Sequence, residues 1–237
     1  MPEFLGRQYL VPQSSTSTFE NQRAVVRKPI IGGLSNIRSK RILDFVGALV
    51  LLVILMPLIL VVAVLVKFMS HPGPILFRQK RIGVNGKPFE LLKFRSMCTN
   101  AEDMLRASAV LYARYLENNH KLPAHEDPRL TGVGRFIRAT SLDELPQLWN
   151  VVRGEMSLVG PRPVLGTEID RYGAAKTMLL SARPGLTGSW QVNGRSEIGY
   201  DRRVELDLVY LSNWSLSADI WILVRTPIAV FSRRGAH

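Results

Sequence analysis

Asp143 and Glu144 are adjacent carboxylates in a segment that is rich in arginine. The surrounding arginines are Arg135, Arg138, Arg153 and Arg162. Adjacent carboxylates repel each other, so the pair is held most easily when a cation lies between them or when guanidinium groups balance their charge. A magnesium ion would supply that cation and would also bind the oxygens of a diphosphate. One carboxylate could serve as a metal ligand while the other attacks phosphorus, so the pattern indicates phosphate chemistry.

The same segment also fits an ordinary capped helix. Ser141 and Glu144 have the spacing of a capping box, and acidic residues are common in the first turn of a helix. The apolar face of such a helix would consist of Leu145, Leu148, Trp149 and Val152. Gly154 would then end the helix. Local features alone leave this structural interpretation open.

Further cations and a rigid loop provide candidate ligands for a phosphorylated substrate. Lys93 and Arg95 alternate with apolar residues, so both are expected on one face of a strand, where they are either ligands or merely solvated. In Pro161-Arg162-Pro163 the prolines restrict the backbone and present the guanidinium in a fixed direction toward phosphate or base. Arg195 follows a turn and is either a ligand or part of a surface salt bridge. The chain lacks a phosphate-binding loop with G-K-S or G-K-T, so side chains and turns must hold any nucleotide.

The segment from Phe45 to Val66 is uncharged and almost wholly apolar. As a continuous helix it would extend about 33 Å, which is enough to span a bilayer. Pro57 interrupts its middle, and basic residues flank both ends, which favours keeping both ends in the cytosol. A spanning helix and a helix that turns back at Pro57 are both compatible with these features.

The remaining chain predicts short strands and helices. Asn85-Gly86 suits the turn of a hairpin over Arg81–Phe94, and Asn100 precedes a helix whose apolar residues, from Met104 to Leu116, are expected in the core. A short strand is predicted over 186–192, and a solvated helix face is predicted for Glu205 and Asp207. The apolar segment 218–231 is predicted to lie on the membrane surface or to cover the core.

Composition narrows the possible partners. The chain has 31 Lys and Arg against 19 Asp and Glu, so its net charge of +12 indicates an anionic partner: nucleic acid, an acidic membrane surface or a phosphorylated substrate. Its one cysteine, Cys98, excludes an intrachain disulfide, and its four histidines have no zinc-binding spacing. Residues 1–37 are polar and without apolar periodicity, which predicts a disordered leader.

Several blocks of the sequence occur in an order that resembles one protein family. T-S-L-D-E-L-P-Q-L-W-N-V followed by G-E-M-S-L-V-G-P-R-P resembles the signature of the bacterial sugar transferases. These are monotopic phosphoglycosyl transferases, which move a sugar phosphate from a nucleotide sugar to a polyprenyl phosphate. K-R-I-G and N-G-K ahead of K-F-R-S-M, and R-P-G-L-T-G with N-G-R from Arg183 to Arg195, are also similar. The resemblance extends from about Lys40 to the C-terminus.

The resemblance implies an architecture. It implies one compact α/β domain of helices around short strands over 71–237, on the cytoplasmic face of the bacterial inner membrane. Residues 38–70 would form a re-entrant membrane helix broken at Pro57, and amphipathic helices would lie in the interface. Family members usually have Ser-Pro at the break, whereas this chain has Met56-Pro57.

The resemblance also implies a reaction. UDP-hexose and undecaprenyl phosphate would give undecaprenyl-diphosphate-hexose and UMP, as the first membrane step of exopolysaccharide or surface glycan synthesis. Asp143 would attack the sugar-bearing phosphorus, Glu144 with Asp143 would bind Mg²⁺, and Arg95 and Arg138 would stabilise the phosphate charge. The full set of expected substrate ligands is Lys93, Arg95, Arg138, Pro161, Arg162, Pro163 and Arg195. Galactose and glucose are both open as the hexose, and the sequence does not indicate an oligomeric state.

Rival classes account for the features less well. A membrane-anchored basic binding protein without catalysis would explain the charge, but the arginines are interleaved with glycines and carboxylates and form no basic and aromatic stripe, so nucleic acid is not expected as a partner. A glycosidase would need two carboxylates about 5–9 Å apart on either side of a sugar, which neighbours in sequence do not naturally provide.

Overall fold

The computed structural model describes residues 37–70, 72–117, 122–194 and 198–231. Residues 1–36, which contain almost all of the predicted leader, lie outside them. The described helices and strands are α3 (Arg38–Met69), β1 (Leu76–Ile82), η2 (Val84–Gly86), β2 (Pro88–Phe94), α4 (Ala101–Arg106), α5 (Ala109–Glu117), α6 (Gly132–Ala139), η3 (Leu142–Glu144), α7 (Gln147–Arg153), β3 (Ser157–Val159), η4 (Ile169–Ala175), α8 (Lys176–Leu180), β4 (Gly185–Thr187), α9 (Ser189–Val192), α10 (Tyr200–Ser212) and α11 (Leu216–Phe231). Helices therefore surround short strands, as the sequence predicts.

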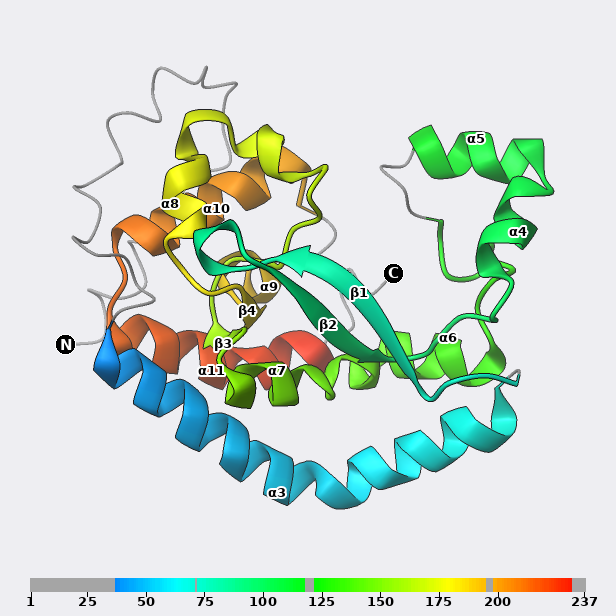
Figure 1. The fold of residues 1–237 in the computed structure, drawn as a ribbon, viewed down its shortest axis with the longest axis horizontal. Coiled ribbons are helices and arrows are strands. Elements are labelled where there is room, and N and C mark those ends of the chain that lie inside the picture. Colours follow the sequence, from blue (N-terminus) through cyan, green and yellow to red (C-terminus); the bar gives the residue numbers. More distant parts are fainter. Residues whose placement is uncertain (1–36, 71, 118–121, 195–197, 232–237) are drawn as a thin grey trace.

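α3 is long and apolar enough to cross a membrane. It is one uninterrupted helix with Pro57 inside it, and it bends near its middle (Figure 1). A proline inside a helix removes one backbone hydrogen bond and crowds the preceding turn, which bends a helix without necessarily ending it. The predicted break is therefore a bend within a continuous helix.

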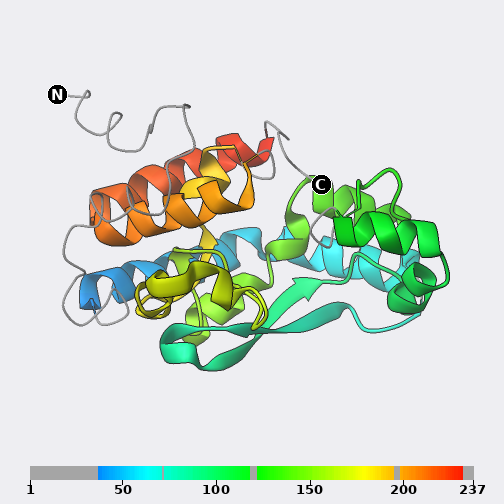
Figure 2. The ribbon, with the colours of Figure 1, turned by 90° about the horizontal axis from the view of Figure 1, so that it is seen from above.

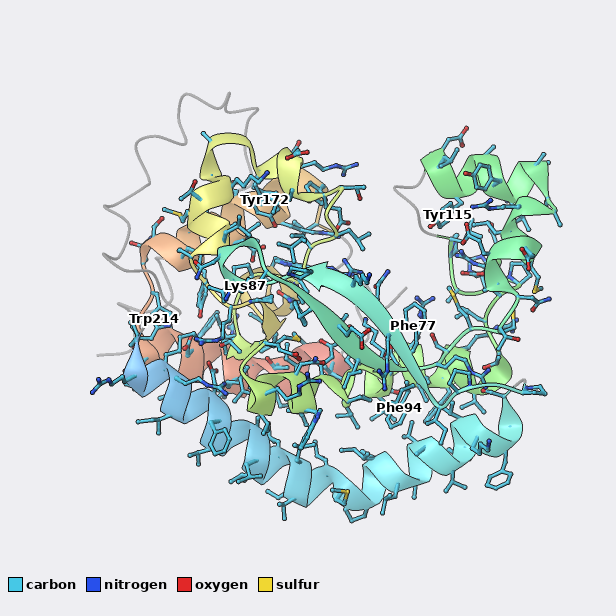
Figure 3. The ribbon with its side chains drawn as sticks, in the orientation of Figure 1. Phe77, Lys87, Phe94, Tyr115, Tyr172 and Trp214 are labelled. Atoms are coloured by element: carbon cyan, nitrogen blue, oxygen red, sulfur yellow. The ribbon has the colours of Figure 1, made fainter. Side chains whose placement is uncertain are left out.

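The N-terminal end of α3 is held by buried polar contacts with the rest of the domain. Lys40 Nζ lies 2.7 Å from Asp219 Oδ2 in α11, and Asp44 Oδ1 accepts hydrogen bonds from Ser157 Oγ and the Leu158 N–H, each at 2.9 Å. Trp214 lies beside this end of the helix (Figure 3). Because these groups are buried, they fix the start of α3 in position.

The C-terminal half of α3 is held by apolar packing. Val62 and Val66 pack against Phe94 at the end of β2 and Ile137 in α6, and Phe94 lies between the hairpin and α3 (Figure 3). At the helix end, the hydroxyls of Ser70 and Thr131 lie 3.3 Å apart. Both ends of α3 are therefore anchored to the same folded domain.

Much of the apolar surface of α3 is not covered by the domain. The exposed large apolar residues of α3 are Ile42, Phe45, Val46, Leu49, Val50, Val53, Ile54, Met56, Leu58, Leu60, Val61, Val64, Phe68 and Met69. Soluble proteins rarely leave an apolar surface of this extent in water. The helix thus suggests membrane association.

β1 and β2 form an antiparallel hairpin whose turn has the predicted chemistry. Asn85 and Gly86 have φ angles of 56° and 75°, the left-handed region that such turns require. The first strand begins at Leu76, earlier than the Arg81 start expected from the sequence. The added residues include exposed polar side chains, so they lack the apolar alternation of a half-buried strand.

β3 and β4 pair in parallel, and glycines let their backbones approach closely. A Cβ on Gly185 would lie 2.1 Å from the Gly160 nitrogen, so a side chain at this position would collide with the backbone. The strand predicted over 186–192 is only partly correct, because β4 covers Gly185–Thr187 and a short helix, α9, follows. This contact fixes the start of the Pro161–Pro163 loop.

The helix predicted after Asn100 is divided into α4 and α5, which project from the domain (Figure 1). Leu105 is buried, but Tyr112 and Leu116 are exposed, so their expected place in the core is wrong. Helical spacing therefore holds only within each short helix, and spacing does not say whether another element packs against the face.

α11 has one face in the core and one face uncovered. Ala218, Asp219 and Ile222 are buried, whereas the exposed apolar residues are Leu216, Ile220, Val224 and Ile228, each four positions after the last. Figure 2 shows that α11 and the hairpin lie on opposite sides of the molecule. The exposed stripe has the spacing of one helix face.

Candidate active site

Asp143 and Glu144 lie in η3, a short 3-10 turn between α6 and α7. Leu142 and Leu145 on either side of the pair pack against the apolar core that includes Val62 of α3. The turn that carries the two carboxylates is thus held in place because Leu142 and Leu145 pack into this core.

The predicted capping box is absent. Ser141 adopts a left-handed conformation with φ of 57° and makes no side-chain cap, and α7 begins only at Gln147. Pro146 has no N–H to bond to the Leu142 carbonyl, so a helix begun at Ser141 would lose one of its first hydrogen bonds here. Gly154, with φ of 82°, ends α7 as predicted. The pair therefore lies in a turn that follows a residue with a left-handed backbone conformation, and not in the first turn of a capped helix.

Asp143 is buried beside cations. Asp143 is only 7% exposed. Burial raises its pKa to about 6, Glu144 adds to this rise, and Lys93 and Arg138 oppose it. Lys93 Nζ lies 2.7 Å from Glu144 Oε1. Near neutral pH this arrangement keeps Asp143 ionised yet poorly solvated, which is the state that favours attack by a carboxylate oxygen.

Asn150 fixes the position of the strand that carries Lys93. It is fully buried in α7, its Oδ1 accepts from the Leu92 N–H at 3.0 Å, and its Nδ2 donates to the Glu90 carbonyl at 2.7 Å. These contacts tie α7 to the free edge of β2 on either side of Leu91 and place Lys93 over Glu144. A role for Asn150 was not predicted, although a polar residue between Trp149 and Val151 in an apolar helix is a sign of a buried hydrogen-bonding side chain.

The Pro161–Pro163 loop leaves β3 close to a second group of cations. Arg162 lies 5.8 Å above the ring of Trp190, and Arg81 Nη1 donates to the Pro163 carbonyl at 3.1 Å. Burial lowers the pKa of Arg81 to about 10, with the charge of Arg162 adding to this effect, while Glu168 and Glu144 oppose it. Arg81 is thus in electrostatic range of both Arg162 in the loop and Glu144 of the carboxylate pair.

A buried carboxylate supports the same loop. Asp207 in α10 accepts hydrogen bonds from the backbone of Arg162 and, at 3.3 Å, from the Tyr172 hydroxyl. Its predicted place on a solvated helix face is wrong, because it is buried and its pKa is raised by that burial. The helical spacing near Arg202 and Arg203 did not reveal which side of α10 faces the core.

The remaining candidate residues are placed differently. Arg138, at the end of α6, acts electrostatically on Asp143. Arg95 lies just beyond the end of β2, where its Nη1 donates to the Pro72 carbonyl at 3.1 Å and its guanidinium lies against Gly73. Arg195 lies outside the described residues. Lys93 and Arg138 therefore surround the carboxylate pair, and Arg162 lies in the neighbouring loop.

The donor set fits a magnesium ion that binds together with substrate. The described residues contain no group of three or more His, Cys, Asp or Glu side chains that could hold a metal. Asp143 and Glu144 together supply carboxylate oxygens only, which Mg²⁺ prefers, and Mg²⁺ in proteins is often held by one or two carboxylates together with substrate phosphates and water. The pair thus fits as part of a Mg²⁺ site whose remaining ligands come from outside the protein.

Comparison with known proteins identifies the family. The model of the bacterial sugar transferase family matches residues 35–233. The chain belongs to the bacterial sugar transferase family. This confirms the resemblance seen in the sequence.

Individual relatives are similar over most of this chain. It is 43% identical over 228 residues to the exopolysaccharide production protein ExoY of Sinorhizobium fredii, covering 94% of this chain and 97% of that protein. It is 46% identical over 202 residues to a UDP-galactose-lipid carrier transferase of Erwinia amylovora and 44% identical over 201 residues to an undecaprenyl-phosphate galactose phosphotransferase of Salmonella typhimurium. Each of these two matches covers 84% of this chain and 41% of the longer relative.

The raised pKa of Asp143 predicts a pH dependence for any reaction in which it is the nucleophile. The attacking form is the carboxylate, so kcat/KM should be constant above the pKa of about 6 and should fall about tenfold per pH unit below it. A higher magnesium concentration should move this fall in kcat/KM to lower pH, because a bound cation favours the charged carboxylate. Circular dichroism over the same range controls for unfolding. A fall in kcat/KM that stays near the ordinary aspartate pKa of about 4 even at the lowest Mg²⁺ concentration that supports turnover, and that does not move with Mg²⁺, would contradict the assignment.

Proposed function

We propose that this sugar transferase moves a hexose-1-phosphate from UDP-hexose to undecaprenyl phosphate and releases UMP, as the first membrane step of exopolysaccharide or surface glycan synthesis. The observation that carries the proposal is the buried, ionisable Asp143 beside Glu144, with Lys93 and Arg138 acting on it. The names of the relatives in Erwinia and Salmonella support the same class of substrates.

The reaction proceeds in two displacements at one phosphorus. An Asp143 oxygen attacks the sugar-bearing phosphorus, the bond from that phosphorus to the bridging oxygen breaks, and UMP leaves with the electron pair. A phosphate oxygen of undecaprenyl phosphate then attacks the same phosphorus, and the bond to Asp143 breaks. Lys93 and Arg138 balance the charge that develops on the phosphoryl oxygens, and Arg162 holds the nucleotide. Glu144 and Asp143 would hold Mg²⁺, which would further neutralise the charge of the diphosphate.

In the membrane, α3 enters and leaves on the same side. Its two ends are anchored to one domain, through Lys40 and Asp44 at the start and through Val62, Val66 and Ser70 toward the end. A spanning helix would place these ends on opposite faces of the bilayer and break one set of contacts. The bend lets the apolar middle of α3 lie in the membrane while the domain stays on the cytosolic face, with the exposed stripe of α11 in the interface.

Topology can be measured by labelling cysteines at either end of the helix. In a Cys98→Ser background, Ser39→Cys and Lys80→Cys place a thiol at an exposed position before and after the membrane segment. Both should react with a membrane-impermeant maleimide in inside-out vesicles and neither should react in intact cells. If one reacts only from the outside, the helix spans the membrane and the re-entrant arrangement is wrong.

The activity is tested by UMP release. Purified protein with Mg²⁺, undecaprenyl phosphate and each member of a panel of UDP-sugars, including UDP-galactose and UDP-glucose, should release UMP with at least one of them. Removing Mg²⁺ with a chelator should stop the release, and restoring it should recover it. A basic binding protein without catalysis would release no UMP under any of these conditions.

A further inference from the structure

An open groove lies between α3, the β1–β2 hairpin and α7. Its volume is about 630 Å³, and its walls are almost wholly apolar. The residues that matter below are Leu52, Ile59 and Ala63 from α3, Leu76 and Phe94 from the hairpin, and Trp149 from α7. Its volume falls in the range of about 300–1,000 Å³ that is typical of sites for small organic ligands.

The groove is continuous with the part of the protein that faces lipid. One wall is α3, which also carries the long exposed apolar face. Trp149, which lines the groove, leaves 52% of its surface exposed. Water in such a groove would find few hydrogen-bonding partners, whereas a hydrocarbon chain from the bilayer could enter along α3 without crossing water.

The far wall of the groove is the backbone that carries the catalytic residues. Leu92 and Phe94 line it and flank Lys93, the ion-pair partner of Glu144. Pro146 also lines it and follows η3 after a single residue. A molecule in the groove therefore lies one layer of backbone away from the carboxylate pair.

Lys67 gives the groove a charge preference. It is the charged residue among the groove's described lining residues, and it lies in the last turn of α3. A cation at the edge of an apolar groove suits an amphiphile with a long hydrocarbon part and an anionic head. Among the substrates of the proposed function, undecaprenyl phosphate has this chemistry.

We propose that this groove binds the isoprenoid chain of the polyprenyl phosphate acceptor next to its phosphate, with Lys67 attracting the anionic lipid toward the groove. The proposal rests on the proposed function and assigns its acceptor subsite to residues outside the catalytic pair. A phospholipid acyl chain is the competing occupant, and the experiments distinguish the two.

The kinetic test narrows the groove with Ala63→Phe and uses Val64→Phe as the matched control. Val64 is exposed on α3 and does not line the groove, so its variant adds the same ring to the outer face of the same helix. Ala63→Phe should raise KM for undecaprenyl phosphate by about tenfold or more, while Val64→Phe should leave it unchanged. Formation of labelled enzyme from UDP-sugar without acceptor should be unaffected in both variants, which also shows that they are folded.

A binding test is independent of turnover. A photoreactive farnesyl phosphate should label peptides containing the groove walls in the wild-type protein in detergent, and the labelling should fall in Ala63→Phe and in Lys67→Met. Undecaprenyl phosphate should compete for this labelling, and phosphatidylglycerol at the same concentration should not.

Equal competition by phosphatidylglycerol would overturn the proposal in favour of an acyl-chain site. An equal rise of KM in the Ala63 and Val64 variants, or no rise in either, would also overturn it. Failure of the proposed function gives a different result, since the wild type would then release no UMP and form no labelled enzyme, whatever the photolabelling shows.

Discussion

Asp143→Asn is expected to abolish turnover and to prevent the formation of any covalent intermediate. The substitution keeps the shape of the side chain but removes the attacking negative charge, and an amide is a poor nucleophile toward phosphorus. Loss of a catalytic nucleophile commonly lowers kcat by about 10⁴-fold or more. Because Asp143 is buried and its pKa is raised by that burial, the neutral amide should not destabilise the fold through loss of charge.

The measurement separates Asp143 from its neighbour. Wild-type protein mixed with Mg²⁺ and a UDP-sugar labelled in the sugar should retain label on the protein and release UMP before acceptor is added, and steady-state kinetics should be ping-pong. Asp143→Asn should show neither labelling nor turnover. Glu144→Gln should lose most activity, with partial recovery at high Mg²⁺ concentration, since it would remove the proposed metal ligand and removes the charged partner of Lys93. If Asp143→Asn protein still became labelled, or if both substrates bound before UMP was released, Asp143 would not be the nucleophile and the pair would only bind the metal.

Lys40→Met should destabilise the folded protein by about 3–5 kcal/mol. Lys40 and Asp219 form an ion pair at 2.7 Å, and the Asp219 side chain is completely buried. Asp219 also accepts hydrogen bonds from the Tyr210 hydroxyl at 2.7 Å and Trp214 Nε1 at 3.1 Å, which hold its carboxylate in place. Removing the lysine leaves a buried charge without its partner, which is why the cost is large.

Denaturant unfolding in detergent measures this effect, and a surface pair provides the control. Arg78 and Glu90 lie 3.3 Å apart with side chains 65% and 52% exposed, so Arg78→Met should cost less than about 1 kcal/mol. The double variant Lys40→Met with Asp219→Leu should be more stable than Lys40→Met alone, because the buried Asp219 charge that Lys40 balances is then removed as well. A Lys40→Met variant as stable as Arg78→Met would show that the pair does not anchor the helix.

Local patterns predicted the parts of the structure that local chemistry determines. The turn at Asn85-Gly86, the end of α7 at Gly154 and the long apolar helix were all readable, because each depends on residues close together in sequence. The carboxylate pair could be identified as a candidate for the same reason. The burial around the pair could not be predicted, because the burial of Asp143 depends on how η3 packs against elements distant in the sequence.

The parts that were missed depend on partners far apart in the chain. Lys40 and Asp219 are separated by 179 positions, and Asn150 bonds to a strand 58 to 60 positions away, so no local pattern pairs them. Helical spacing placed Asp207 on a solvated face and Tyr112 on a core face. In the structure Asp207 is buried and Tyr112 is exposed. Periodicity shows that a helix has faces, and only the packed structure shows which element covers each face.

In the proposed membrane arrangement, the double anchoring of α3 would also determine how the enzyme searches for its lipid acceptor. A helix fixed to the domain at a single end could swing, and the active site would move up and down relative to the lipid headgroups. With both ends fixed, the height of the active site above the bilayer would be constant, so a lipid that diffuses laterally would meet it at the same depth every time. The encounter would become a search in a plane, and its rate would depend on the number of acceptor molecules per area of membrane and not on their concentration in the volume of the cell.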